Sequence, residues 1–474
     1  MKCLFEFLNN DKNSNIFNYL KQKKLLIDKD FKKYIYINMN LNEKEFLQNI
    51  LKNNFIFISQ KKRLSFFTSL FPLIKNYASN EGDLFYNDDS IYINRFRATH
   101  FYEKFNESSE KISDTKYTET IFGQVFQNLK NIECKTFIMD GKNKRLFHVN
   151  LEGEKAIDAG GPYNEIISSM GNELQSSYIN LFIKTSNNKN NLGQLRDRFI
   201  TNPDANKYLD KLAYEFIGKF MATCITSGEN INLNLHPIVW KSILEMNVTF
   251  EDFESVDYTF YNMIKQLEKC LKEKDTNLIE SFNLNFVIKN LNESDVELKE
   301  GGKEIKVNLD NLEEYINLAK LEKINEVISQ TNYIKKGLYL CIEQNILKLL
   351  NYKELERLVC GKNKFDINDF KNHTVYYGYK GDEDLIKWFW KWMENIDEQM
   401  KFKYLKFVSG RARLPKSGTG FGYRHIITKV SLDNIFPKAS TCFFTLKLPN
   451  YNDKELFEEK IKYAIENCAD ITDY

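Results

Sequence analysis

The segment FPKASTCFFTLKLP at residues 436–449 decides how the rest of the chain is interpreted. Its side chains alternate from Cys442 onward, so a strand would place Cys442, Phe444 and Leu446 on one face. Pro437 cannot donate a backbone hydrogen bond, and we therefore expect the strand to begin after it. This prediction places Cys442 at the mouth of a strand, beside a loop, where a thiol is accessible.

The residue type of Cys442 is compatible with two roles. A thiol reacts as its thiolate, and a free cysteine with a pKa of about 8.5 is already partly ionised near neutral pH. Most free cysteines, however, are small buried apolar residues. Periodicity alone favours the buried role for Cys442 by about two to one.

Length and composition describe a globular protein with room for two or three domains. The chain has 474 residues, of which 42% are apolar and 28% charged. Its 67 Lys and Arg balance 65 Asp and Glu, which argues against a nucleic-acid partner. The N-terminal MKCLFEFLNNDKN is too short and too polar for a signal peptide, and no apolar run of about 18 residues predicts a membrane span.

Cysteine and histidine usage bears on redox state and on metals. The eight cysteines and five histidines are scattered, with no CxxC pair. We therefore expect neither a disulfide framework nor a metal site. A reducing compartment, cytoplasmic or also nuclear, fits this pattern.

Residues 1–90 are predicted to form a helical N-terminal extension. The apolar stretch FFTSLFPLIKNYA at 66–78 reads as a helix docked on the main body and broken near Pro72. A packing role for this extension is favoured by about two to one over recruitment of substrates.

A second informative stretch is RLFHVNLEGEKAIDAGGPYNEIISSM at 145–170. It reads as a strand, a turn and a helix, and Gly160 and Gly161 permit backbone conformations that a Cβ forbids. Neither GxGxxG nor GxxxxGK[ST] is present. A tight structural turn is therefore favoured over a nucleotide site.

Several segments together resemble the HECT family of ubiquitin ligases. FPKASTCFFTLKLPNY is similar to the active-site segment of that family, whose thioester-forming cysteine falls on Cys442. Two positions depart from the common pattern. Ser440 stands where His is frequent, and Phe444 stands where Asn is frequent.

Earlier segments resemble the same family in the same order, over roughly residues 90–474. KELERLVCG at 353–361 matches a family segment that makes Cys360 a core cysteine and not a catalytic one. VELKEGGKEIKVN matches another, which we expect to form a hairpin with its turn at Gly301 and Gly302. The other matching residues include Gly153, Glu154, Asp158, Gly161, Glu165, Leu233, Leu235, Pro237, Trp240, Lys241, Tyr315, Gly410, Arg413 and Pro415.

The resemblance implies an α+β fold of two lobes. The mostly helical N-lobe with small sheets would span 91–378, and its conjugating-enzyme-binding subdomain about 250–345. A flexible hinge at 379–383 would join it to a smaller α/β C-lobe at 384–474, which carries the cysteine.

The resemblance also implies an activity. Cys442 would accept ubiquitin as a thioester from a ubiquitin-conjugating enzyme and pass it to a lysine of a protein substrate. Ser440 and Thr441 would orient the thioester carbonyl. No cofactor and no metal is required, and the partners are ubiquitin, the conjugating enzyme and the substrates.

Further site residues are assigned by rough alignment with the family. Asp470 and Asp473 are candidates to deprotonate the attacking lysine, although solvated tail charges are favoured by about three to one. Ile471 occupies a position where the family usually has Phe. Three residues are candidates for the conjugating-enzyme groove, with ordinary core positions as frequent an explanation for each: Ile264, Leu267 and Tyr333.

Two rival functions remain open on the sequence. A cysteine hydrolase needs a histidine beside the thiol, and His425 is the nearest in sequence. A catalytically weak binding module for ubiquitin or the conjugating enzyme would keep both lobes without the transfer. The departures at Phe444 and Ile471 favour that second rival.

Overall fold

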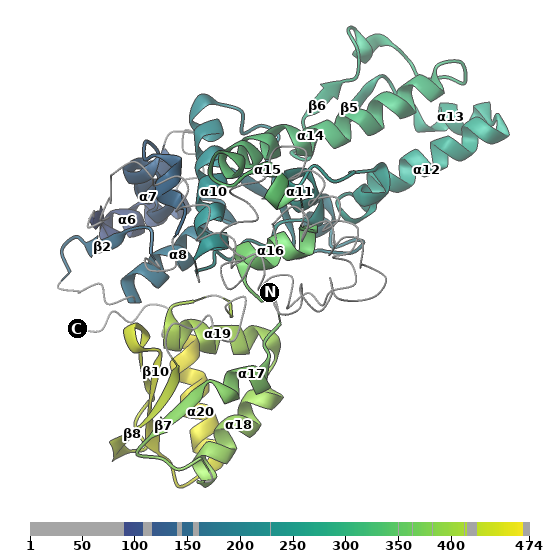
Figure 1. Cartoon of the computed structure of the whole chain (residues 1–474). Coiled ribbons are helices and arrows are strands. Elements are labelled where there is room, and N and C mark those ends of the chain that lie inside the picture. Colours follow the sequence, from purple (N-terminus) through teal and green to yellow (C-terminus); the bar gives the residue numbers. More distant parts are fainter. Residues whose placement is uncertain are drawn as a thin grey trace, which may run out of the picture.

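The protein has two lobes, each built around its own apolar core (Figure 1). The first core runs from Ile91 to Cys360, and the second runs from Phe365 to Ile465. The large lobe is mainly helical, whereas the small lobe combines a sheet with helices, which confirms the predicted α+β class. The computed structural model describes residues 90–107, 116–139, 145–154, 161–227, 229–348, 350–362, 364–381, 383–411, 413–414 and 424–467. Within these ranges no helix combines the length and the apolar character that a bilayer crossing requires.

The large lobe begins with a two-stranded parallel sheet and three helices. Strand β1 (Ser90–Ile93) pairs with β2 (His148–Leu151), as Ile93 and Val149 become part of the core. The helices packed around this pair are α6 (Arg95–Glu107), α7 (Ile121–Leu129) and α8 (Gly161–Leu174).

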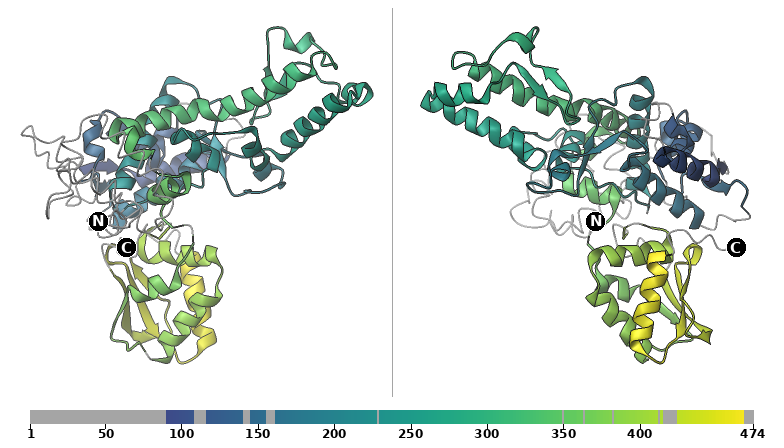
Figure 2. Two further views of the ribbon diagram at one scale, coloured as in Figure 1. Left: turned by 45° about the vertical axis from the view of Figure 1, so that its right-hand side comes forward. Right: turned by 180° about the vertical axis from the view of Figure 1, so that it is seen from behind.

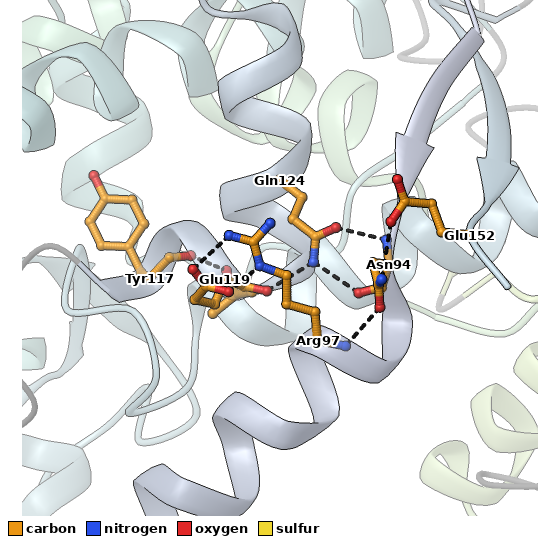
Figure 3. A network of polar contacts seen from close by, with 7 residues as sticks. Asn94, Arg97, Tyr117, Glu119, Gln124 and Glu152 are labelled. Atoms are coloured by element: carbon orange, nitrogen blue, oxygen red, sulfur yellow. Dashed lines mark hydrogen bonds and ion pairs between the residues drawn. The ribbon is translucent and has the colours of Figure 1, made fainter.

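A polar network fixes the start of α6 against α7 (Figure 3). The amide nitrogen of Gln124 donates to the backbone oxygens of Asn94 (3.0 Å) and Glu119 (2.9 Å), and its oxygen accepts from the Asn94 backbone (2.8 Å). Asn94 also donates to Glu152 (3.0 Å), and Arg97 forms an ion pair with Glu119. Because Gln124 is buried and fully bonded, the network specifies how the β1–α6 corner packs on the lobe.

The centre of the large lobe is the packing of α10 (Tyr208–Thr226) along α14 (Leu312–Cys341). Helix α10 buries aromatic side chains in the core, including Phe216 and Phe220. Two glycines allow the helices to touch backbone to backbone. A Cβ on Gly218 would lie 2.0 Å from the Ile334 oxygen, and one on Gly337 would lie 1.9 Å from the Glu215 oxygen. Side chains at either position would force the helices apart.

An arm projects from the large lobe away from the small lobe (Figures 1 and 2). It consists of the first half of α14 together with α12 (Tyr258–Glu273), α13 (Thr276–Phe282), β5 (Val287–Lys289) and β6 (Asp295–Glu297). The predicted hairpin around Gly301 and Gly302 is wrong, since β6 pairs with β5 and the turn lies at 290–294. Gly301 instead precedes a 3-10 turn, which glycine pairs permit as readily as a hairpin.

Shorter elements complete the large lobe. Strands β3 (Phe182–Lys184) and β4 (Phe199–Thr201) pair antiparallel beside α14. The remaining helices are η3 (Lys116–Glu119), η4 (Cys134–Phe137), α9 (Ser186–Lys189), α11 (Pro237–Ile243), η5 (Phe250–Ser255), η6 (Gly302–Glu304), α15 (Gln344–Leu347) and α16 (Tyr352–Cys360).

The small lobe is a four-stranded sheet with helices packed against it. The strand order is β7-β8-β10-β9, with β9 antiparallel and the other pairs parallel. Ile427, Leu446 and Leu448 are buried in the same core as Phe389 and Phe457 of the helices. The elements are α17 (Ile367–Asn372), β7 (Thr374–Tyr377), α18 (Asp384–Asn395), α19 (Glu398–Ser409), β8 (His425–Asp433), β9 (Lys438–Ser440), η8 (Thr441–Phe443), β10 (Thr445–Asn450) and α20 (Lys454–Asn467).

The junction between the lobes differs from the segment expected at 379–383. Tyr379 is buried in the second core and donates its hydroxyl to the Leu448 oxygen (3.0 Å). Strand β7, which precedes this segment, already belongs to the small-lobe sheet. The glycines there mark the turn from β7 to α18, and the change from one core to the other falls between Cys360 and Phe365. A flexible hinge between the lobes stays a prediction.

Candidate functional site

Cys442 lies in a tight turn between two antiparallel strands. It is the middle residue of η8, which connects β9 to β10, and Ser440 pairs with Thr445 across the turn. The expectation that Cys442 and Phe444 share one face of a strand is therefore wrong. Phe444 has a left-handed backbone (φ +50°), and β10 begins only at the next residue. Side-chain alternation cannot reveal such a residue, because it assumes extended backbone throughout.

The neighbours of Cys442 place the turn at the surface of the small lobe. The structure describes the backbone of Cys442 but not its side chain. Ser440 and Thr441 are half-buried, while Phe443 is 61% exposed. The hydroxyl-bearing residues Ser440 and Thr441 precede Cys442 by two residues and one residue along the chain. The tail candidates Asp470, Ile471 and Asp473 lie outside the described residues.

Phe444 combines an unfavourable backbone with a well-packed ring. A left-handed conformation disfavours most L-residues by about 1–2 kcal/mol, whereas Asn adopts it more readily. The ring is only 5% exposed and lies 5.1 Å from the His425 ring and 6.0 Å from that of Phe370. Packing in the core therefore holds Phe444 where a small polar residue would suit the backbone.

His425 is a core residue of the small lobe. Its ring is fully buried, with Nδ1 3.0 Å from the Thr374 hydroxyl and Nε2 2.8 Å from the Tyr404 hydroxyl. Burial lowers the pKa of His425 to about 3, so the ring is neutral at physiological pH. Both nitrogens are occupied, and the histidine that a cysteine hydrolase would need here is not available as a base.

The turn that carries Cys442 faces the large lobe. η8 packs against α8, and the nearby end of α19 lies beside the same helix. The Asn164 amide of α8 donates to the Ser409 oxygen across the junction (3.4 Å). Cys442 is therefore held where two lobes meet.

Two arginines that follow α19 add polar contacts to this junction. Arg411 forms an ion pair with Glu229 (2.9 Å), and Arg413 donates to the Asn234 side chain. Both partners belong to the loop that follows α10 in the large lobe. The junction is thus built from charged and amide groups.

An arginine supports the helix on which the Cys442 turn packs. Arg95 contacts Glu154 with two nitrogens, one at 2.8 Å, and reaches Glu165 on α8 at 2.5 Å. The hydrogen bond with Glu154 raises the pKa of Arg95, so the guanidinium is charged at any physiological pH. The matched residues Glu154 and Glu165 thereby have a structural role, while Asp158 and Gly160 lie outside the described residues.

The three groove candidates do not form one surface. Ile264 and Leu267 are fully buried on α12, so neither offers side-chain surface to a partner in this structure. Tyr333 is half-buried on α14, and the ammonium group of Lys211 lies 5.7 Å from its ring. Rough alignment with the family selected positions in the buried stripe of α12, since alignment does not distinguish core positions from exposed ones.

Exposed apolar residues on the arm were missed by the sequence reasoning. Leu278 on α13 is 44% exposed and Leu321 on α14 is 55% exposed. Leu321 falls outside the buried stripe that includes Tyr315, Ile316 and Ala319. An apolar residue on the polar side of an amphipathic helix is the signal that could have found it.

Cys360 is a buried core cysteine, as the motif indicated. Its sulfur lies 3.5 Å from the Leu233 oxygen, and burial raises its pKa to about 11. Among the described side chains, no three His, Cys, Asp or Glu residues are grouped to hold a metal ion.

Comparison with known proteins identifies one matching family and several related ubiquitin ligases. The family described as HECT-domain (ubiquitin-transferase) matches residues 168–472. The chain is 30% identical over 359 residues to the E3 ubiquitin-protein ligase HERC2 of Homo sapiens and of Mus musculus, covering 75% of this chain and 7% of each relative. It is 28% identical over 376 residues to the E3 ubiquitin-protein ligase NEDD4 of Homo sapiens, covering 77% of this chain and 27% of that protein. The chain thus spans a small part of these relatives.

Proposed function

The chain belongs to the HECT-domain (ubiquitin-transferase) family, and from this premise we propose that it is a ubiquitin-protein ligase with a thioester intermediate on Cys442. The observation that carries the proposal is the position of the Cys442 turn. It sits between β9 and β10, on the side of the small lobe that packs against α8. A thiol in this place can accept ubiquitin from one partner and pass it to another, because partners can approach it from either lobe.

The first proposed step is a thioester exchange. The Cys442 thiolate attacks the carbonyl carbon of the thioester that joins the C-terminus of ubiquitin to a conjugating enzyme. The conjugating enzyme's thiolate leaves, and one thioester replaces another of similar energy. This step needs a good nucleophile more than a strong base, which agrees with a histidine locked in the core. We propose that the hydroxyls of Ser440 and Thr441 orient the carbonyl.

The second proposed step transfers ubiquitin to a lysine. The neutral amine of a substrate lysine attacks the Cys442 thioester, Cys442 leaves as a thiolate, and an isopeptide bond remains. The amine must lose its proton, for which Asp470 and Asp473 are our candidates. Ile471 is a candidate for positioning the lobes during this step. No cofactor or metal takes part in either step.

The arm is our proposed docking site for the conjugating enzyme. It projects from the large lobe and presents the exposed Leu278 and Leu321. Because the arm and the Cys442 turn lie in different parts of the molecule, transfer requires the small lobe to move. We propose that this motion occurs about 361–364. The proposed partners are ubiquitin, the conjugating enzyme and protein substrates, in the reducing cytoplasm or nucleus.

A reconstituted reaction tests the proposal. The protein is mixed with activating enzyme, a panel of conjugating enzymes, ATP and ubiquitin, and products are separated on reducing and non-reducing gels. We expect isopeptide products from the unmodified chain and none from Cys442→Ala. A Leu278→Asp and Leu321→Asp double variant tests the arm, and Lys303→Asp on the same arm serves as its exposed control.

One outcome of this experiment favours a different function. If the chain binds charged conjugating enzyme but yields neither adduct nor isopeptide across the panel, it is a catalytically weak binding module. The left-handed Phe444 is the observation that favours this alternative, because it departs from the frequent Asn directly beside the turn. Restoration of activity by Phe444→Asn would then identify the cause.

A further inference from the structure

The arm is held on the rest of the large lobe, here called the body, at three places. The chain enters the arm at the start of α12 and returns to the body along α14 (Figures 1 and 2). The third contact is made by the turn at 290–294, which connects β5 to β6. This turn meets the residues that follow β4 in the body, Asn202 to Asp204.

Amide groups make the contact between the turn and the body. The Asn292 amide nitrogen donates to the side-chain oxygen of Asn202 (2.6 Å) and to the Asp204 carboxylate (2.7 Å). The Asn290 amide nitrogen donates to the other oxygen of Asp204 (3.2 Å), while the Asn290 side-chain oxygen accepts from the Asn292 backbone (2.9 Å). Asp204 thus binds both asparagines of the turn, and its charge strengthens both hydrogen bonds.

Neighbouring groups keep this contact in one geometry. Asn202 is fully buried, and its amide nitrogen donates to the Asn180 backbone oxygen (2.8 Å), so its side-chain oxygen is oriented to accept from Asn292. Leu291 lies between the two asparagines of the turn and is also fully buried. Its backbone oxygen accepts from the ammonium group of Lys189 on α9 (2.5 Å). The turn is therefore fixed on the body by apolar burial as well as by hydrogen bonds.

The turn restrains a rotation that the two chain crossings leave possible. Two crossings define an axis about which an arm can pivot, and a further bonded contact opposes that pivot. At the α12 crossing, the side-chain oxygen of Asn187 on α9 accepts from the Tyr258 backbone (2.7 Å). Along α14, the Gln330 amide donates to the Pro203 oxygen (2.7 Å). These bonds fix the crossings, and the turn fixes the angle between the arm and the body.

We propose that Asn292 and Asp204 are positioning residues, which hold the arm at one angle so that a docked conjugating enzyme presents its thioester along one line of approach. This inference rests on the proposed role of the arm as the docking site. With the arm fixed, the small lobe supplies the motion that transfer requires. A free arm would spread the thioester over many orientations, and transfer would proceed only from the fraction that faces Cys442.

A distance measurement in the full-length chain tests whether the contact holds the arm. Spin labels are attached to unnatural amino acids at two exposed positions, Lys269 on α12 of the arm and Tyr208 on α10 of the body. Double electron–electron resonance then reports the distribution of distances between the arm and the body. We expect one narrow distribution in the chain that carries no further substitution. A broad distribution in that chain would overturn the proposal.

Substitutions at the contact should broaden this distribution. We expect broadening in Asn292→Ala and in Asp204→Ala, and little more in the double variant, because both changes weaken the same contact. Asn292 is half-buried and Asp204 is exposed, so neither substitution opens the core. The matched control is Asp295→Ala, which should leave the distribution narrow, because Asp295 pairs with Lys289 within the hairpin (3.1 Å). A distribution that stays narrow in both single variants would contradict the proposal.

Single-turnover transfer tests whether the fixed angle matters for the reaction. Charged conjugating enzyme is mixed at several concentrations with the unmodified chain or with Asn292→Ala, and thioester formation on Cys442 is followed. We expect the maximal rate to fall several-fold in Asn292→Ala, while the half-saturating concentration of conjugating enzyme stays unchanged. An unchanged or higher maximal rate, in a chain whose distance distribution has broadened, would overturn the positioning role.

The two measurements separate this inference from the proposed function. If the unmodified chain forms no thioester with any conjugating enzyme, the proposed function fails, and the positioning role fails with it. The distance distributions do not depend on ubiquitin transfer, so they still decide whether the turn at 290–294 holds the arm.

Discussion

The interiors of the two lobes differ in kind from the junction between them. Each interior is a continuous apolar core, with Trp240 fully buried in the large lobe and Phe389 in the small one. The junction instead rests on polar contacts such as Asn164 with Ser409 and Arg411 with Glu229. Water replaces polar contacts at little net cost, whereas it cannot replace apolar burial. We therefore expect each lobe to hold itself together and the lobes to separate without unfolding.

The largest expected effect breaks one core and leaves the other. Phe389→Ala should destabilise the small lobe by about 3–5 kcal/mol, because a fully buried ring is replaced by a cavity. Hydrogen exchange measured by mass spectrometry should show faster exchange in the small-lobe strands alone. Equal loss of protection in α10 and α14 would contradict two independent cores.

A smaller effect is expected at the residue that connects the small-lobe core to the Cys442 turn. Phe444→Asn loses the buried ring but relieves the left-handed backbone, so the net loss should be about 2–3 kcal/mol. Phe443→Asn is the control, because that side chain is 61% exposed and should change stability by less than about 0.5 kcal/mol. Urea unfolding followed by a small-lobe probe measures both. A neutral Phe444→Asn would mean that the ring is not held in the core.

Acidification should weaken both cores through one buried histidine each. Burial lowers the pKa of His236 and of His425 to about 3, so folding opposes proton binding below the unfolded pKa of about 6.5. Stability is then fully present above pH 6.5 and is lost as the pH falls toward 3. Each histidine should contribute a loss of about 2 kcal/mol between pH 7 and pH 5.

Variants assign the pH dependence to its lobe. His425→Gln should lower the stability of the small lobe at pH 7 and reduce its slope with pH, while the large lobe keeps the slope from His236. Unfolding of the unmodified chain and of His425→Gln is measured at pH 7 and pH 5 with a probe in each lobe. This gives, for each chain, one slope of stability against pH per lobe. An unchanged small-lobe slope in His425→Gln would show that other groups cause the acid sensitivity.

The smallest effect on stability is expected at the junction. Arg411→Ala should change the unfolding of either lobe by less than about 1 kcal/mol, because Glu229 becomes hydrated when the lobes part. The variant should instead shift the population of lobe orientations, visible as an increased radius of gyration in small-angle scattering. Adding Glu229→Gln to the Arg411→Ala variant should change neither the stability nor the radius of gyration much further. A loss of several kcal/mol would mean that the junction is part of the folding unit.

The resemblance to the HECT family implied the α+β class and the two lobes, and amphipathic periodicity is typical of helices such as α18. The details that failed share one cause. The Cys442 turn depends on a positive φ at Phe444, and the hairpin depends on which strands pair. Each is a property of tertiary packing that local pattern does not encode.

The sequence motifs identify candidate site residues but not their surroundings. The motif singled out Cys442 and indicated that Cys360 is a core residue, and the structure buries Cys360. Rough alignment with the family could not tell that Ile264 and Leu267 are buried on α12, since it carries no information on exposure. It also could not show that His425 is committed to Tyr404 and Thr374.

The central claim is that Cys442, and not Cys360, carries ubiquitin. The most direct measurement is the intact mass of the chain after brief incubation with charged conjugating enzyme, compared between Cys442→Ala and Cys360→Ala. The account predicts one thiol-labile ubiquitin on the unmodified chain and on Cys360→Ala, and none on Cys442→Ala. A thiol-labile ubiquitin that persists on Cys442→Ala would contradict it.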